Sequence, residues 1–235
     1  MSEKCMFCGK PYRVETLEAC GHVISIPFPV CDCETRELEK QRKAEEQTAK
    51  LRRVAALNLP PIFAPYWLKN LECEHRADAQ IFVEGFRVRK SKGLFLVGPN
   101  GNGKSTLAAV ICKELAYRGH RVLFTTMTEM LDRMELGAGF NRAQQAQKLL
   151  KTLTAYDFVV FDDYGRENYT PVRLQNVFQI VDKLYTHQIP FCITTNQECF
   201  NRVAKIPELE AINDRISQAL TKWDFERPSF RREKK

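Results

Sequence analysis

The sequence has no run that approaches the ~18 consecutive apolar residues of a membrane-spanning helix. Its first residues, Met1 to Cys5, lack the apolar segment of a signal peptide. It also contains no internal repeat and no low-complexity segment, so nothing indicates a repeat protein. We therefore expect a protein of the cytoplasm that has no membrane partner.

The composition allows one sizeable domain and a small appendage, because 235 residues with a 44% hydrophobic share can bury a core. The formal net charge is +7. A moderate basic excess is compatible with nucleic acid or an acidic partner, and equally with a purely solvating surface. Three regions follow one another: a cysteine-rich module over 1–35, a charged helix and linker over 36–61, and alternating strand and helix patterns over 62–235.

The alternation from residue 62 onward predicts a parallel α/β sheet. Buried strands are expected over 93–97, 121–125, 157–162 and 190–195, because apolar residues run almost continuously there. Helices are expected over 105–117, 126–134 and 208–220, and a long one from Thr170-Pro171. Thr126 and Glu129 have the spacing of a capping box, which fixes one helix start.

A glycine-rich segment lies between the first expected strand and its helix. It reads Gly98-Pro99-Asn100-Gly101-Asn102-Gly103-Lys104-Ser105, which is the Walker A pattern. Glycines let backbone N–H groups turn toward phosphate oxygens, and the helix directs its positive end to the same place. We predict that the segment binds ATP, with Lys104 at the β- and γ-phosphates, Ser105 on Mg²⁺ and Thr106 near the α-phosphate. A glycine-rich turn without ligand is the alternative.

Two carboxylates follow the apolar strand that ends in Phe161. Asp162 is expected to hold the Mg²⁺ shell, and Asp163 to orient or deprotonate the attacking water. This is the form of a Walker B strand, and we expect it to neighbour the strand before the glycine-rich segment. An Asp-Asp turn at a strand end is the alternative.

Two further polar residues have open interpretations. Asn196 follows the strand over 190–195 and could contact the γ-phosphate or the water, or it could cap a helix. Arg215 follows Asp214 on a later helix. It could reach the γ-phosphate of a neighbouring subunit, or it could be a surface arginine paired with Asp214 or Glu210.

The first region carries two close pairs of cysteines in a turn-rich segment. Two thiolate pairs suit tetrahedral Zn²⁺, which substitutes for a hydrophobic core in a module of about 35 residues. The preferred ligands are Cys5, Cys8, Cys31 and Cys33. His22 or Cys20 could replace one of the second pair. A redox role for the first pair would need a thioredoxin-like context, which is not seen.

These motifs, in this order, resemble the DnaC/DnaI-type helicase loaders of bacteria and phages. These loaders are AAA+ ATPases of the clade that also holds the initiator DnaA and the transposition ATPase IstB. The resemblance covers nearly the whole chain. It includes the cysteine pairs, the charged helix, the Walker A segment, the Asp-Asp-x-Gly form of Walker B and the sequences Leu59-Pro60-Pro61-Ile62-Phe63, Thr194-Thr195-Asn196 and Asp214-Arg215-Ile216.

The resemblance implies an α/β P-loop AAA+ core with a parallel sheet flanked by helices, without a C-terminal lid. It also implies a homo-oligomer that assembles on ATP and DNA, a zinc module that contacts the replicative helicase of the primosome, and single-stranded DNA as ligand. Asn196 would be the sensor-1 residue and Arg215 the arginine finger. No residue matches a sensor-2 arginine. Phe140, Arg142 and Lys148 would contact DNA, although Arg142 and Lys148 also suit a solvated helix face.

The leading hypothesis is therefore an ATPase that loads a DnaB-type helicase onto single-stranded DNA. An IstB-like transposition ATPase, which would prefer duplex DNA, is the second. A small-molecule P-loop kinase is the third, and the lack of an arginine-rich lid argues against it.

Overall fold

The computed structural model describes residues 4–19, 22–28, 30–136, 140–227 and 229. The chain divides into two compact units, Met1–Arg52 and Arg53–Lys235. In the described part of the chain, no helix combines the length and apolar character needed to cross a bilayer.

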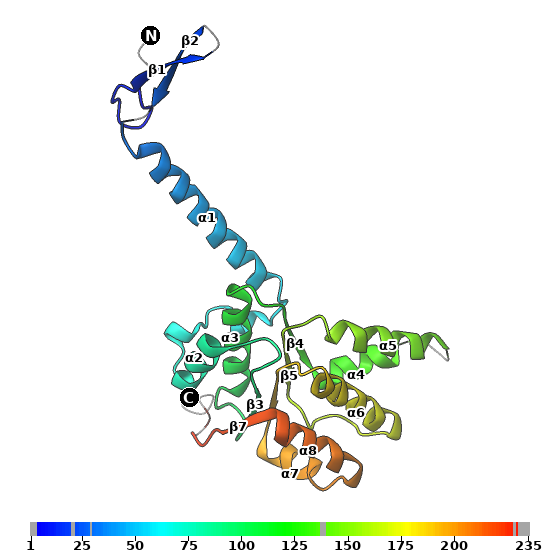
Figure 1. Cartoon of the computed structure of the whole chain (residues 1–235). Helices are drawn as coiled ribbons and strands as arrows, with labels where there is room; N and C mark the ends of the chain where they lie inside the picture. The colour runs from blue at the N-terminus through cyan, green and yellow to red at the C-terminus, as the bar shows by residue number, and fades with distance from the viewer. Residues whose placement is uncertain (1–3, 20–21, 29, 137–139, 228, 230–235) are drawn as a thin grey trace. The chain divides into compact units, whose positions relative to one another are not determined.

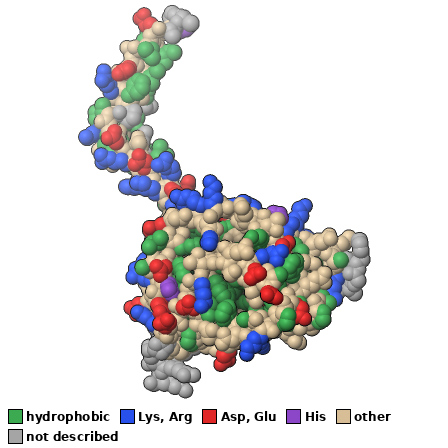
Figure 2. All heavy atoms as spheres, turned by 60° about the horizontal axis from the view of Figure 1, so that its bottom comes forward, with side chains coloured by type: hydrophobic (Ala, Val, Ile, Leu, Met, Phe, Trp, Pro, Cys, Tyr) green, Lys and Arg blue, Asp and Glu red, His purple; other side chains and the backbone are tan. Residues whose placement is uncertain are grey.

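The first unit contains a β-hairpin and most of a long helix. Strands β1 (Arg13–Ala19) and β2 (His22–Phe28) pair antiparallel, and α1 spans Cys33–Ala55. The sequence predicted a charged helix from residue 36, and the helix begins three residues earlier, at a cysteine. Figure 2 shows positive and negative side chains mixed along this helix, as expected for a solvated surface. The hairpin was not predicted.

The second unit is built on a five-stranded sheet in the order β4-β5-β6-β3-β7, with every neighbouring pair parallel. The parallel sheet predicted from the sequence is confirmed. Two features differ from the expectation. Strand β6 separates the Walker A strand from the Walker B strand, and an unpredicted strand, β7, forms one edge. The strands are β3 (Gly93–Val97), β4 (Val122–Thr126), β5 (Phe158–Asp162), β6 (Phe191–Thr195) and β7 (Leu220–Asp224).

Helices cover both faces of the sheet, and the two cores follow the alternation of the strands. Phe95, Val159 and Ile193 belong to one cluster, whereas their neighbours Leu94 and Val160 belong to the other. In Figure 1, α2 and α3 lie on one side of the sheet and α4 to α8 on the other. The helices are α2 (Arg76–Gly85), α3 (Lys104–Tyr117), α4 (Met127–Glu135), α5 (Phe140–Leu153), α6 (Pro171–Thr186), α7 (Gln197–Val203) and α8 (Glu210–Ala219).

Two of the predicted helix starts, those of α4 and α6, are confirmed by capping bonds. The Thr126 hydroxyl accepts a hydrogen bond from the Glu129 N–H at 3.0 Å, and the Glu129 carboxylate accepts from the Thr126 N–H at 3.2 Å. Thr170 caps α6 in the same way through the N–H of Arg173. Each cap satisfies backbone donors that a helix leaves unpaired at its first turn.

Lysine 113 of α3 holds the segment that precedes the sheet. Its ammonium group donates to the carbonyl oxygens of Phe63, Ala64 and Tyr66 at 2.7–3.3 Å. It also lies 4.4 Å from the centre of the Trp67 ring, a cation–π contact. The side chain is therefore buried while its charge stays paired with backbone dipoles.

Candidate functional site: a nucleotide site and a cysteine cluster

The glycine-rich segment forms a tight loop between the carboxyl end of β3 and the start of α3. Gly101 and Gly103 adopt φ values of 82° and 96°, the left-handed region that glycine enters without strain. Gly98 approaches the chain after β7 so closely that a Cβ would lie 2.3 Å from the Phe225 carbonyl oxygen. The glycines therefore let the backbone turn tightly and pack against the chain after β7, a loop before a helix start of the kind that binds phosphate.

Lysine 104 is folded back onto this loop. Its ammonium group donates to the carbonyl oxygens of Gly98 and Pro99 at 2.8 and 2.6 Å, and to the Asn102 amide oxygen at 2.9 Å. Burial lowers the pKa of Lys104 to about 8, and the carboxylates of Asp163 and Asp162 oppose that shift. A cation held in the mouth of the loop is placed to meet an incoming phosphate.

The Walker A and Walker B segments meet side chain to side chain. Asp162 accepts hydrogen bonds from Ser105 and, at 2.5 Å, from the Thr194 hydroxyl. Burial raises the pKa of Asp162 above its ordinary value, while these two hydrogen bonds act in the opposite direction. A hydroxyl and a carboxylate in contact are the oxygen ligands that Mg²⁺ takes beside a triphosphate. The two residues predicted to hold magnesium are thus brought together, and Thr194 is a partner that the sequence analysis did not single out.

Asp163 projects from a left-handed turn directly after β5, with φ 57°. Its N–H donates to the Thr194 hydroxyl at 3.0 Å, and its carboxylate pairs with Arg166 at 3.4 Å. Positive φ is uncommon outside glycine, although aspartate tolerates it better than most residues. The turn separates the directions of the two carboxylates: Asp162 faces Ser105, and Asp163 remains half exposed beside the loop.

Asn196 caps a helix, as one of its two predicted roles required, and also contacts the Walker A loop. Its amide oxygen caps α7 by accepting from the Cys199 N–H at 2.6 Å. Its amide nitrogen donates to the Asn100 side-chain oxygen at 3.4 Å, across the mouth of the Walker A loop. The cap fixes the side chain, and the amide N–H is thereby directed toward the loop.

Arg215 lies on α8 and is held within its own chain. Its guanidinium pairs with Asp182 of α6 at 3.2 Å and lies 4.8 Å from the centre of the Phe178 ring. It also donates to the Ala211 carbonyl oxygen. These contacts place Arg215 with α6 rather than with Asp214 or Glu210, the partners that the sequence suggested for a surface arginine.

The residues expected to contact DNA belong to α5. Arg142 is partly buried on this helix and Lys148 is exposed. Phe140 is the first residue of α5, and its side chain lies outside the described residues.

Four thiols converge in the first unit. The Sγ atoms of Cys5, Cys8, Cys31 and Cys33 all lie within 4.8 Å of one another. This spacing and donor set fit one tetrahedral Zn²⁺, with Zn–S bonds of ~2.3 Å. His22 is exposed at the first position of β2 and is not part of this group of four, and Cys20 lies outside the described residues.

The first cysteine pair is carried by a tight knuckle. The Cys5 carbonyl oxygen accepts from the Gly9 N–H at 2.8 Å, and Gly9 has φ 69°. A hydrogen bond with the Lys10 backbone and, next in size, one with the Cys31 side chain lower the pKa of Cys8 to about 7. Contacts with their cysteine neighbours raise the pKa of Cys31 and, to about 12, the pKa of Cys33. Cys8 is therefore the thiol of these three that most readily reaches the thiolate form, which is the form that ligates metal.

Metal removal is expected to unfold the cysteine-rich part of the first unit, whereas the second unit, with its α/β sheet, stays folded. Cys5 is the single hydrophobic residue that is fully buried among the described residues up to Arg52, so packing alone cannot stabilise the hairpin. Chelator titration followed by amide dispersion in NMR spectra, with zinc measured by atomic spectroscopy, tests this prediction. Cys8→Ser should lose zinc, whereas Cys73→Ser, which changes a thiol of the second unit, should keep it. Full amide dispersion after zinc removal would contradict the prediction.

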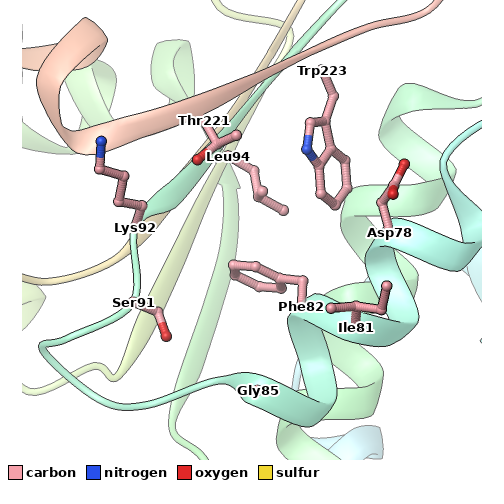
Figure 3. A pocket seen from close by; sticks show the side chains of 9 residues that line it. All are labelled: Asp78, Ile81, Phe82, Gly85, Ser91, Lys92, Leu94, Thr221 and Trp223. Carbon is pink, nitrogen blue, oxygen red and sulfur yellow. The ribbon is translucent and has the colours of Figure 1, made fainter.

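A cavity of about 370 Å³ lies elsewhere on the second unit. Figure 3 shows Phe82 and Ile81 of α2 facing Trp223 and Leu94, with Lys92 at the margin. Lys92 precedes β3, whereas the Walker A loop follows the other end of the same strand. The cavity is therefore separate from the nucleotide site.

The order of the parallel sheet, the phosphate loop after β3 and the paired aspartates after β5 define a P-loop nucleotide-binding protein of the AAA+ type. The profile of the family described as "IstB-like ATP binding protein" matches residues 18–235. The chain belongs to this family of ATP-binding proteins.

Proteins with similar sequences are of two kinds, helicase loaders and ATP-binding proteins of insertion sequences. The replicative helicase loader DnaC of Escherichia coli strain K12 is 31% identical over 130 residues, which are 54% of this chain and 52% of DnaC. An insertion sequence ATP-binding protein of Sinorhizobium fredii is 30% identical over 146 residues, 61% of this chain and 48% of that protein. The chain thus spans about half the length of the curated relatives it matches.

Solved structures support the fold. The crystal structure of the DnaC helicase loader has a TM-score of 0.59 at 22% identity, covering 71% of this chain and 100% of that one. The crystal structure of DnaI has a TM-score of 0.61 at 22% identity, covering 75% and 98%. These neighbours confirm the DnaC-like α/β architecture expected from the sequence.

Proposed function

We propose that this chain is an ATPase that loads a replicative, DnaB-type helicase onto single-stranded DNA during the initiation of replication. The observation that carries the proposal is the combination of two units in one chain. One unit gathers the parts of an ATP site, and the other gathers four thiols beside exposed apolar side chains. A small module that zinc would stabilise, with apolar side chains on its surface, is suited to holding a partner protein.

The surface of the first unit supports a docking role. Met6 and Phe7, in the knuckle between the first two cysteines, are 83% and 51% exposed, and Leu38 of α1 is 66% exposed. Together with Glu37 and Gln41 they line a groove of about 250 Å³. Apolar side chains left in water and grouped around a groove favour a protein partner. In this proposal that partner is the helicase.

In the nucleotide site, MgATP supplies the phosphoryl group that is transferred to water. Lys104 and the N–H groups of the loop would hold the phosphates, and Ser105 and Asp162 would hold the metal. Asp163 would orient the attacking water, and Asn196 would contact the γ-phosphate or that water. The remaining proposed loop contacts are Gly98, Asn100, Gly101, Asn102, Gly103 and Thr106. Assembly into an oligomer on ATP and DNA would place Arg215 of one copy at the nucleotide of the next.

The proposed DNA surface lies on α5. Its exposed Lys148 and partly buried Arg142 would contact the phosphates of a single strand, and Phe140 would stack on a base.

Asp163→Asn is expected to keep MgATP binding and to lower ATP turnover by about 10²–10⁴-fold. Asparagine preserves the shape of the side chain but cannot accept a proton from water. Steady-state phosphate release, with binding followed separately by calorimetry, measures the two effects. Asp157→Asn is a matched control, because that carboxylate pairs with Arg121 at the opposite end of β5. Unchanged turnover in Asp163→Asn would remove the catalytic assignment.

A second candidate is an ATPase that directs transposition to duplex DNA. The insertion sequence relative favours this candidate, because its 30% identity to this chain is nearly the same as the 31% identity of DnaC. The two functions differ in protein partner and in DNA form.

The test compares both properties with the full chain. A pull-down with a purified DnaB-type helicase is carried out under ATP and under ADP, and affinity for single-stranded and duplex oligonucleotides of one sequence is measured with ATP. A loader should capture the helicase in a nucleotide-dependent manner and prefer the single strand. Failure to bind the helicase, together with a preference for duplex, would replace the loader by the transposition ATPase.

A further inference from the structure

Arg166 lies at the junction of three segments that form the nucleotide site. One of its guanidinium nitrogens is 3.4 Å from the Asp163 carboxylate, and another donates to the Asn100 side chain of the Walker A loop at 3.5 Å. The same Asn100 oxygen accepts from Asn196 at 3.4 Å. The sequence analysis assigned no role to Arg166.

The backbone on both sides of Arg166 is fixed. The Gly165 N–H donates to the Glu167 carboxylate at 2.7 Å, and the Gly165 carbonyl oxygen accepts from Arg202. A Cβ on Gly165 would lie 2.8 Å from that of Cys199, so this segment packs closely on α7. Glu167 is only 3% exposed and also accepts from the Tyr169 hydroxyl at 2.7 Å.

The side chain of Arg166, in contrast, is 51% exposed and makes contacts that are long for charge-assisted hydrogen bonds. An exposed ion pair of this kind is weak and is readily exchanged for a better partner. A triphosphate in the loop would be such a partner, because phosphate oxygens accept two parallel hydrogen bonds from a guanidinium.

We propose that Arg166 is a γ-phosphate-binding residue that acts within its own chain, exchanging the Asp163 carboxylate for the terminal phosphate when MgATP occupies the loop. This inference rests on the proposed nucleotide site. Because ADP lacks the terminal phosphate, Arg166 would remain on Asp163 in the ADP state. The residue would thereby distinguish ATP from ADP.

The exchange has a consequence for Asp163. Its backbone stays in place, because its N–H is held by the Thr194 hydroxyl. Its carboxylate, however, loses the cation that occupies it and becomes available to water. The neighbouring charged groups are Lys104 in the loop and Asp162 at the end of β5. In the proposed site these two contact the phosphates and the metal, so neither replaces Arg166 on Asp163. Arg166 would therefore couple recognition of the γ-phosphate to release of the water-orienting carboxylate.

The test is calorimetric titration of the full chain with MgATP and with MgADP, for the wild type and three variants. Arg166→Ala should weaken ATP binding by about tenfold, with ADP binding unchanged, because only ATP carries the group that the guanidinium contacts. Arg166→Lys, which keeps the charge without the fork, should recover part of the loss. Arg118→Ala is the matched control: it removes an exposed arginine at the other end of α3 and should change neither affinity.

Two results would overturn the inference in different ways. In the first, the wild type binds both nucleotides, and Arg166→Ala weakens the binding of ATP and ADP equally or weakens neither. Arg166 then does not contact the γ-phosphate, but the assignment of the nucleotide site is unaffected. If the wild type binds neither nucleotide, the proposed function fails and the role of Arg166 fails with it.

Discussion

Lys104→Ala is expected to weaken MgATP binding by at least about 10³-fold, equivalent to about 4 kcal/mol. Lys104 is 7% exposed, and its ammonium group is held at the mouth of the loop by the Gly98 and Pro99 carbonyl oxygens. A triphosphate entering the loop would offer it anionic acceptors in place of neutral carbonyl oxygens, which adds Coulomb attraction between opposite charges to the hydrogen bonds. Calorimetry with MgATP measures the loss.

Lys113→Ala is the matched control for this variant. It removes a second buried lysine from the same helix, also held by backbone carbonyl oxygens, but those carbonyls belong to the segment before α2. It should lower the melting temperature and leave nucleotide affinity per folded molecule unchanged. Retained ATP affinity in Lys104→Ala, or an equal loss in Lys113→Ala, would contradict the assignment of the phosphate site.

Arg215→Ala is expected to lower ATP turnover by about 10³–10⁵-fold, the range associated with an arginine that stabilises charge on a transferred phosphoryl group. The loss should occur only under conditions in which the chain assembles, since its contacts in one chain are with α6 and α8. Turnover should be measured alongside the mass of the assembly, so that a failure to assemble is distinguished from a failure of catalysis.

Asp182→Asn provides the corresponding control. It removes the carboxylate that pairs with Arg215 at 3.2 Å but keeps the guanidinium and its contact with the Phe178 ring. An arginine finger should therefore remain active in this variant. If Arg215→Ala assembles and hydrolyses ATP at the wild-type rate, the residue serves only to join α8 to α6.

The elements that the sequence predicted correctly are those with local causes. The apolar residues 158–161 predicted the strand that became β5, because a strand covered on both faces needs apolar residues on both. The caps at Thr126 and Thr170 satisfy donors within three residues of themselves, so their effect is visible in a short window. The convergence of Cys5, Cys8, Cys31 and Cys33 was expected from the two close pairs.

The elements that were missed depend on distant partners. Strand β7 contains Thr221 and Lys222, which are exposed, and its pairing with β3 joins residues that are more than a hundred positions apart. The placement of β6 between the two Walker strands cannot be seen from chain order either. In the chain, β6 follows the Walker B strand β5, but in the sheet it lies between β5 and the Walker A strand β3. Strand order is set by crossover connections and long-range packing, for which periodicity gives no signal.

The contacts of the nucleotide site likewise divide into those that the local sequence predicted and those that depend on distant segments. Asn196 was predicted either to cap a helix or to face the nucleotide, and the side chain does the first with its oxygen while its nitrogen reaches the Walker A loop. Arg166 sits in a short polar turn with no distinctive pattern, and only the folded chain brings it against Asp163 and Asn100.

The sequence by itself determined the chemistry: the glycines, the lysine and the two aspartates that suit a magnesium triphosphate, and the cysteines that suit zinc. It could do so because these requirements act over a few neighbouring bonds. Tertiary structure decided which groups meet, through the order of the strands and the turn after β5. Those contacts depend on packing between segments far apart in the chain, and they join Ser105 to Asp162 and place an unassigned arginine beside the proposed catalytic carboxylate.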